Sequence, residues 1–219
     1  MLITHFTRAH YVLVGITALY VVPLSIKFSL EGNGEFLAYI GQVVLLLLIL
    51  MVTIRKTHFP VWLLTLLSVW AALHMAGGAV HVGDGVLYAY HFFHVVGSGD
   101  AYVLRYDQVV HFYGFFVATF VAYWLLLVQL KPAYRVGVVA FVAALAGMGF
   151  GALNEVIEFM AVLAAPDTGV GGYYNTAIDL VSNMLGALTA ALVIVYASVG
   201  RRFHTEIVSS DLKRTALRP

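Results

Sequence analysis

Long apolar runs alternate with short polar segments along the 219-residue chain. Each run approaches the ~20 residues that an α-helix needs to cross a bilayer. We expect spanning helices at about residues 11–30, 36–54, 59–75, 107–130, 134–164 and 176–200. The predicted fold class is therefore all-α, a polytopic transmembrane helix bundle with about six spanning helices.

The connection between the third and fourth helices contains GVLYAYHFFHVV, which is too short and too polar to span. Its aromatic residues suit the headgroup region of a bilayer. We therefore predict an outer interfacial helix between helices 3 and 4. His91 and His94 lie in this segment, and their spacing leaves open whether they take part in a site.

Composition places the chain among integral membrane proteins. It is 62% hydrophobic and 11% charged, whereas soluble domains carry roughly 25% charged residues. Without a repeat or a linker, residues 1–219 are expected to form a single integral membrane domain, with about residues 203–219 as a cytoplasmic tail. The absence of cysteine excludes disulfides and thiolate ligands. No basic pattern indicates a nucleic-acid partner.

Charge at the loop ends predicts the orientation. Acidic residues without basic neighbours mark the first and fifth loops, at Glu31, Glu35 and Asp167. Basic residues mark the second and fourth loops and the tail: Arg55, Lys56, Lys131, Arg135, Arg201, Arg202, Lys213, Arg214 and Arg218. The positive-inside rule then predicts a protein of the cytoplasmic (inner) membrane with both termini cytoplasmic. Lys27 departs from the rule and is expected to snorkel or to pair with Glu31.

Several ionisable residues interrupt the later apolar runs at a similar predicted depth, in the outer part of the bilayer. Asp107 and His111 stand four apart, and Glu155 and Glu158 three apart, so each pair shares one helix face. Asn175, Asp179 and Asn183 continue a polar stripe on the last helix, and His74 adds a side chain from the third. Such groups are costly in a membrane and usually face a bundle interior or a wet cavity. We expect them to meet in one site.

The residue types favour a divalent metal, because carboxylate and imidazole groups suit Fe, Mn or Zn. The predicted ligands for one or two ions are His74, Asp107, His111, Glu155, Glu158 and Asp179. Catalytic roles are expected for Glu155, Glu158 and Asp107, with hydrogen-bonding support from Arg105, Asn154, Asn183 and His81.

Three alternatives remain open at this point. Without a metal, crowded carboxylates would hold a proton and suit acid–base or relay chemistry. Asp107 could instead cap the fourth helix, and Thr176 with Asp179 could form a capping box.

The pairs Gly147 with Gly151 and Gly186 with Ala190 predict close helix approach beneath the cluster.

The segments HMAGG, RYDQVVH, NEVIE and YNTAIDLVSNMLGA together resemble the YjdF-type bacterial inner-membrane proteins, a family of unknown function. They are more distantly similar to VanZ-like membrane proteins. The resemblance covers about residues 74–187, and Asn175 stands where an aspartate is expected. It implies that the family site consists of Asp107, His111, Glu155, Glu158, Asp179 and Asn183. By analogy with VanZ-like proteins, it points to the cell envelope.

The expected function is a metal-dependent enzyme, a hydrolase or an oxidoreductase, that acts on a membrane lipid, a lipid-linked molecule or another amphipathic substrate. One alternative is a non-enzymatic protein that binds lipid or an envelope precursor. Another is a small proton-coupled transporter. The transporter is disfavoured because the chain lacks an inverted repeat and has few polar residues in the inner halves of its helices.

Overall fold

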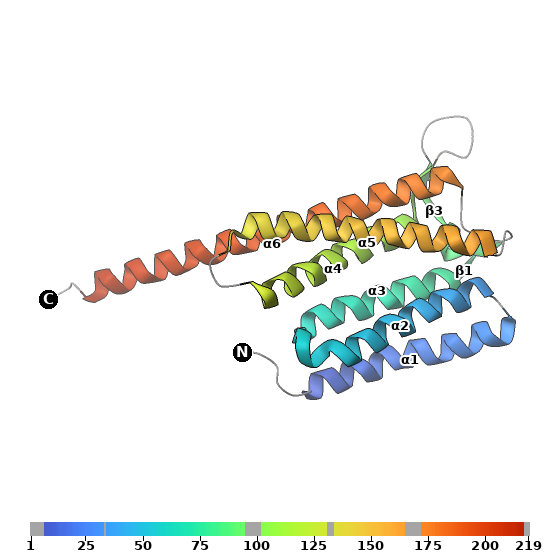
Figure 1. Ribbon diagram of the computed structural model, residues 1–219, viewed down its shortest axis with the longest axis horizontal. Coiled ribbons are helices and arrows are strands. Elements are labelled where there is room, and N and C mark those ends of the chain that lie inside the picture. The colour runs from blue at the N-terminus through green and yellow to red at the C-terminus, as the bar shows by residue number, and fades with distance from the viewer. Residues whose placement is uncertain (1–6, 33, 95–101, 131–133, 165–171, 217–219) are drawn as a thin grey trace.

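Six long helices make up the fold (Figure 1). The computed structural model describes residues 7–32, 34–94, 102–130, 134–164 and 172–216. The helices are Arg8–Glu31 (α1), Gly34–Thr57 (α2), Val61–Ala79 (α3), Tyr106–Gln129 (α4), Val136–Ala164 (α5) and Tyr173–Ala216 (α6). Each contains a stretch long and apolar enough to cross a membrane. The predicted all-α polytopic bundle is confirmed. Lys131 and Asp167, which helped to predict the orientation, lie outside the described residues.

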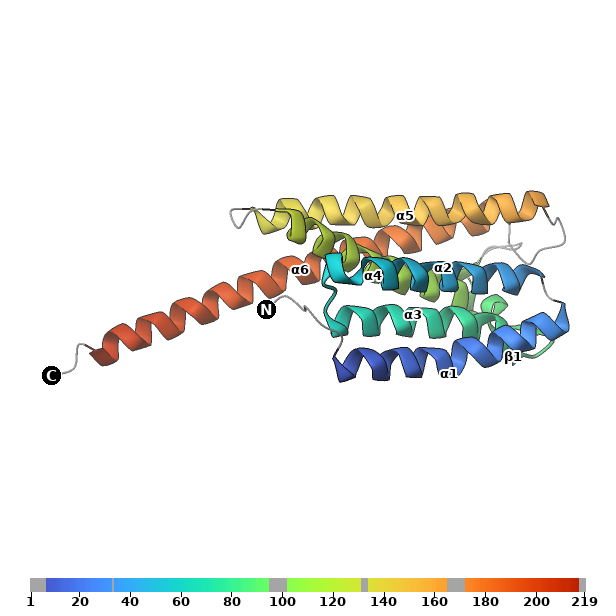
Figure 2. The ribbon, with the colours of Figure 1, turned by 60° about the horizontal axis from the view of Figure 1, so that its bottom comes forward.

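The helices form two groups that lie side by side (Figures 1 and 2). In one group α4, α5 and α6 pack extensively against each other, and in the other α1, α2 and α3 do so less closely. The groups meet mainly between α3 and α4. The beginning of α1 and the far end of α6 lie toward the same end of the bundle (Figure 1).

Apolar side chains fill the interior of the first group. One buried cluster joins Phe28 of α1, Val43 of α2 and Met75 of α3. A second joins Leu63 of α3 to Val117 of α4 and therefore connects the two groups. Hydroxyl groups add short polar contacts, since Thr17 Oγ1 lies 2.7 Å from Ser68 Oγ. Van der Waals packing of apolar side chains between helices thus holds this half together.

Lys27 lies near the end of α1 and has two partners. Its Nζ donates to the carbonyl oxygen of Ala79, the last residue of α3, at 3.2 Å. It also lies 3.9 Å from Glu31 Oε1. A cation at a helix C-terminus satisfies orphan carbonyls and complements the helix dipole. The expected Lys27–Glu31 pair is present, and its second contact ties α1 to α3.

The predicted outer interfacial helix between helices 3 and 4 is wrong. Two short antiparallel hairpins occupy that connection instead: β1 (His81–Val82) pairs with β2 (Gly85–Val86), and β3 (His91–His94) pairs with β4 (Tyr102–Arg105). Among the described residues of this connection, only a 3-10 turn, Leu87–Ala89, is helical. Gly83 closes the first hairpin with φ 60°, a conformation that glycine adopts readily. Aromatic residues have high strand propensity. Pairing with residues 102–105 makes residues 91–94 a strand rather than a helix.

The sixth helix is longer than predicted. The apolar pattern ends near residue 200, but α6 continues without interruption to Ala216. The segment expected as a tail from about residue 203 is therefore helical over most of its length.

Glycines on α5 and α6 allow the second group to pack closely, as the small-residue pairs predict. A Cβ at Gly151 would lie 2.8 Å from Asn183 Nδ2, and one at Gly147 would meet Thr119 of α4. At Gly186 the obstacle is backbone, the carbonyl oxygen of Phe112. These approaches bring α4, α5 and α6 together beside the ionisable residues.

Candidate functional site

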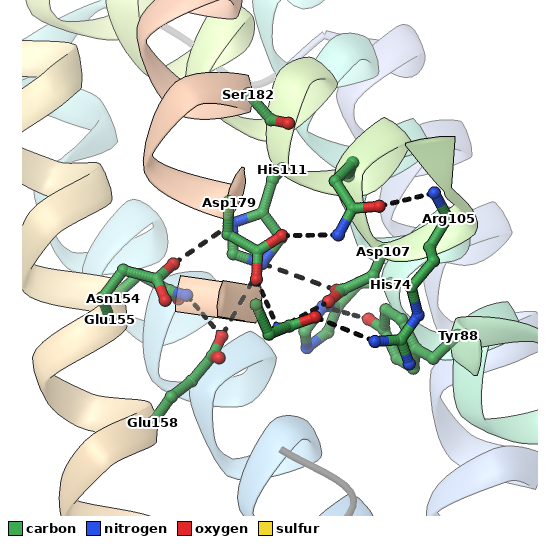
Figure 3. A network of polar contacts seen from close by, with 12 residues as sticks. His74, Tyr88, Arg105, Asp107, His111, Asn154, Glu155, Glu158, Asp179 and Ser182 are labelled. Atoms are coloured by element: carbon green, nitrogen blue, oxygen red, sulfur yellow. Dashed lines mark hydrogen bonds and ion pairs between the residues drawn. The ribbon is translucent and has the colours of Figure 1, made fainter. Parts of the chain in front are cut away.

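His111 lies at the centre of a polar cluster between α4, α5 and α6 (Figure 3). Its Nε2 is 3.5 Å from Asp107 Oδ1 and 3.7 Å from Glu158 Oε1. Its Nδ1 is 3.4 Å from Glu155 Oε1. The imidazole is only 7% exposed, so these contacts are made away from bulk solvent. Ionisable residues separated by more than 40 positions in sequence thus meet at one ring.

Asn183 determines which nitrogen of His111 carries a proton. The Asn183 Oδ1 lies 3.0 Å from Nδ1, and an amide oxygen can only accept a hydrogen bond. In this arrangement Nδ1–H donates to Asn183. A neutral imidazole then has its lone pair on Nε2, facing Asp107 and Glu158.

Asp179 is the most enclosed carboxylate of the cluster, with no exposed surface. Gln108 Nε2 donates to its Oδ1 at 2.9 Å, and Asn175 Nδ2 donates to its Oδ2 at 2.6 Å. Asn175 also lies 3.5 Å from Asp107 and accepts a hydrogen bond of 2.9 Å from Arg105 Nη1. Both oxygens of Asp179 therefore have amide donors.

Glu155 is also buried, but it lacks the amide donors that Asp179 has in the described structure. It is 6% exposed, and neither of its carboxylate oxygens has a hydrogen-bond partner within the described part of the chain. Its close contact is with His111 Nδ1, which already donates to Asn183 Oδ1. A buried carboxylate that lacks hydrogen bonds is costly unless a cation or a proton compensates it. Glu155 is therefore the carboxylate of the cluster that most needs a cation or a proton.

Glu158 and Asp107 form the open side of the cluster. Each side chain is 18% exposed, more than His111 or Glu155. Asn154 Nδ2 donates to Glu158 Oε1 at 2.7 Å, and Gln42 Nε2 of α2 donates to Asn154 Oδ1 at 3.1 Å. These two carboxylates are thus the least buried of the four around His111.

Two groups of three residues have the composition and spacing to hold a metal ion. One contains Asp107, His111 and Asp179, and the other contains His111, Glu155 and Glu158. Within each group one ligand atom per residue lies within 4.8 Å of the others. Ligands 2.0–2.2 Å from a tetrahedral zinc would be about 3.3–3.6 Å apart. The separation of 3.7 Å between His111 Nε2 and Glu158 Oε1 is close to that value, whereas the 3.4 Å contact of Glu155 is with the other ring nitrogen, Nδ1.

Simple helix capping does not explain the two aspartates. The N-cap of α4 is Arg105, whose backbone N–H donates to Gln108 Oε1, and Asp107 lies one residue inside the helix. Because α6 begins at Tyr173, Thr176 and Asp179 lie beyond its first residues. Both carboxylates turn toward the cluster instead.

The remaining predicted residues lie at different distances from this centre. His74 belongs to neither three-residue group: Tyr88 O–H lies 2.6 Å from its Nδ1, and Trp70 stacks on its ring. His81 is exposed in β1. His91 pairs with Arg105 in the β3–β4 ladder. The side chain of His94 lies outside the described residues.

Sequence reasoning missed two amides, Gln108 and Gln42. Gln108 stands three residues before His111 and is 2% exposed, and Gln42 interrupts the apolar sequence of α2. A polar amide inside a spanning helix was the available signal, since it needs a partner there. Asn175, placed where the related family was expected to have an aspartate, is part of the network through its amide.

A family model described as "Predicted membrane protein (DUF2238)" matches residues 9–200. The chain belongs to this family. The resemblance to a bacterial membrane family of unknown function is therefore confirmed, and the match includes the polar cluster and all of the helices except the first residue of α1 and the end of α6 beyond residue 200.

An uncharacterized protein of Thermotoga maritima is 32% identical over 102 residues. That alignment covers 46% of this chain and 53% of the relative, so the chain spans about half the length of this curated relative. No solved structure matches the chain. The comparisons support a membrane protein of this family.

Proposed function

We propose that the cluster around His111 binds one divalent metal ion and that the protein is a metal-dependent membrane enzyme. The observation that carries this proposal is Glu155, a buried carboxylate whose two oxygens lack hydrogen-bond partners among the described residues and which lies 3.4 Å from His111. A cation would compensate this charge. It would also offset the neighbouring carboxylates of Asp107, Glu158 and Asp179.

Of the two possible ligand groups, His111, Glu155 and Glu158 fit an ion better. The oxygens of Asp179 in the other group are already held by Gln108 and Asn175. Because both groups need His111, a neutral imidazole with one available lone pair favours one ion per chain. The hydrogen bond from His111 Nδ1 to Asn183 would orient the ring, as outer partners of metal-binding histidines commonly do.

The chemistry follows from the open side of the site. A bound ion would polarise a substrate oxygen or activate water. Asp107, the partly exposed carboxylate outside the favoured ligand group, would contact the substrate and could accept a proton there. Since the cluster lies within helices that can span a membrane, we propose a lipid, a lipid-linked molecule or another amphipathic compound as substrate. Zinc would favour hydrolysis, and iron or manganese would also permit oxidative chemistry.

We also propose a location and an orientation for the protein in the membrane. The charge bias of the loops favours the cytoplasmic membrane with both termini in the cytoplasm, which would place the cluster toward the outer leaflet. A substrate of the cell envelope would be accessible there.

Metal analysis of the purified protein tests the proposal. We expect about one ion per chain, and Co²⁺ added to metal-free protein should give the absorption of a nitrogen- and oxygen-ligated site. Glu155→Gln and His111→Gln should each abolish both signals. Asp84→Asn removes an exposed carboxylate from the β1–β2 turn and is the matched control. Metal content at background, or content unchanged in both variants, would overturn the proposal.

Turnover is tested separately. Wild-type protein and Glu158→Gln should be incubated with lipid extracts, and the products compared by mass spectrometry. A product formed only by the metal-loaded wild type supports the enzyme. A metal-loaded protein that retains a lipid without altering it would instead be the binding protein.

A further inference from the structure

We infer that Gln42 of α2 is a positioning residue for Glu158, acting through the amide of Asn154. The inference rests on the proposed metal site, because Glu158 belongs to the favoured ligand group. Gln42 lies in neither ligand group, and no ionisable residue accompanies it on the described part of α2 between Ile40 and Ile54. Its role follows from the direction of two hydrogen bonds.

The first bond is unusual for its place in the fold. Gln42 is surrounded in sequence by apolar residues of a helix whose surface is largely exposed to the lipid region. An amide at that depth needs a protein partner, because lipid offers none. Gln42 Nε2 finds one 112 positions away, donating to Asn154 Oδ1 of α5 at 3.1 Å. The bond joins the α1–α3 group to the α4–α6 group.

The second bond depends on the first. Each side-chain amide has one accepting end and one donating end. Because Gln42 donates to Asn154 Oδ1, the Nδ2 end of Asn154 points the other way and donates to Glu158 Oε1 at 2.7 Å. Rotating the Asn154 amide by half a turn would place its oxygen against the carboxylate and its nitrogen against Gln42 Nε2. The contact with the carboxylate would then be repulsive, so Glu158 fixes which end of the Asn154 amide faces it, and the bond from Gln42 Nε2 holds that amide in place.

Glu158 is the ligand that most needs such support. It lies on the open side of the cluster, 3.7 Å from His111 Nε2. A long side chain that is partly exposed loses rotamer freedom when it becomes a ligand. Fixing Oε1 in advance reduces that loss, and hydrogen-bonded partners of metal ligands typically change metal affinity by about 10–100-fold.

A double-mutant cycle on metal affinity tests the inference. Co²⁺ is titrated into metal-free full-length wild type, Gln42→Leu, Asn154→Leu and the double variant, and the dissociation constants are compared. We expect Gln42→Leu to weaken binding by about 10–100-fold. In the Asn154→Leu background the same change should have no further effect, because Gln42 acts through Asn154.

Thr53→Val is the matched control on α2, since the Thr53 hydroxyl bonds only to the carbonyl of Ile49 in the described structure. Its Co²⁺ affinity should equal that of the wild type. Gln42→Asn, which keeps the amide on a shorter side chain, should restore part of the affinity lost in Gln42→Leu. The melting temperature of each metal-free variant separates positioning from loss of fold, because affinities are compared only among variants that melt cooperatively.

The outcomes separate this inference from the proposed function. If the wild type binds no Co²⁺, the metal site fails and the role of Gln42 fails with it. If the wild type binds Co²⁺ and Gln42→Leu binds it equally well, the metal site stands and the positioning role is overturned. Additive effects of Gln42→Leu and Asn154→Leu would also overturn it, since they would show that Gln42 acts independently of Asn154.

Discussion

The two halves of the bundle use polar residues in opposite ways. In α1–α3 the hydroxyls bond mainly to helix carbonyls and to each other, as Thr17, Tyr20 and Ser68 do. In α4–α6 the ionisable side chains face one another around His111. Both halves have similar hydropathy. The difference teaches that the partners of the polar groups, rather than the apolar character of the helices, distinguish the two halves.

The largest expected effect is the loss of stability when a side chain is introduced at Gly186, where α6 packs against the backbone of α4. Gly186→Ala would place a Cβ against the carbonyl oxygen of Phe112, which cannot move without shifting α4. We expect the free energy of unfolding to fall by about 3 kcal/mol, the upper part of the usual range for overpacking. Denaturant unfolding in detergent measures it.

Gly149→Ala is the control for that change, since a Cβ there meets nothing within 4 Å. It should unfold like the wild type. Equal stability of Gly186→Ala and Gly149→Ala would remove close packing as a distinction of the second half.

Neutralising both glutamates of α5 should weaken metal binding and leave the fold intact. In the variant Glu155→Gln with Glu158→Gln we expect Co²⁺ affinity to fall more than about 100-fold, because two ligand charges are lost. The folded state should persist, since replacing two crowded carboxylates removes repulsion and a desolvation cost. Metal titration and thermal unfolding of the same sample give both results.

The opposite pattern, with Co²⁺ affinity retained and the fold lost, would make these glutamates structural. The second half would then resemble the first.

A matched pair of buried polar residues sharpens the comparison further. Thr17→Val in α1 should lower the free energy of unfolding by about 0.6–1.7 kcal/mol, as interhelical hydrogen bonds in membranes do, and leave Co²⁺ binding unchanged. Asn183→Leu in α6 removes the acceptor for His111 Nδ1 and should weaken Co²⁺ binding by about 10–100-fold. An effect of Thr17→Val on Co²⁺ affinity would show that the halves are not separable.

The orientation can be tested without perturbing either half. The chain has no cysteine, so single cysteines at Asp84, in the β1–β2 turn, and at Lys56, near the end of α2, can be labelled selectively. In intact cells an impermeant reagent should label Asp84→Cys and leave Lys56→Cys unlabelled. Stability should be unchanged at both exposed positions. The reverse labelling pattern would invert the predicted topology.

The helices could be predicted from sequence because hydropathy and length are local properties. The bounds of α3 to α5 differ from expectation by only a few residues. Residues 91–94 could not be predicted in the same way, because their strand is defined by pairing with residues 102–105. The end of α6 was also missed, since its last turns carry no apolar signal.

The site was predictable to the extent that its members are charged. Asp107, His111 and Glu155 were expected to meet because isolated intramembrane ionisable groups are costly. Gln108 and Gln42 were missed because an uncharged amide gives a weaker signal. His74 was placed among the ligands by depth alone, and depth does not specify its contact with Tyr88.

The length of α6 has a mechanical consequence. It runs for 44 residues without a proline, which corresponds to about 66 Å, roughly twice the hydrocarbon thickness of a bilayer. From Asp179 to Ala216 the helix extends about 55 Å, so a tilt of about 10° at the cluster would move its far end by roughly 10 Å. Distances between spin labels near the two ends of the bundle, with and without Co²⁺, would detect such a tilt. As a rigid lever, α6 would magnify a small rearrangement among the ligands into a displacement at its distant end.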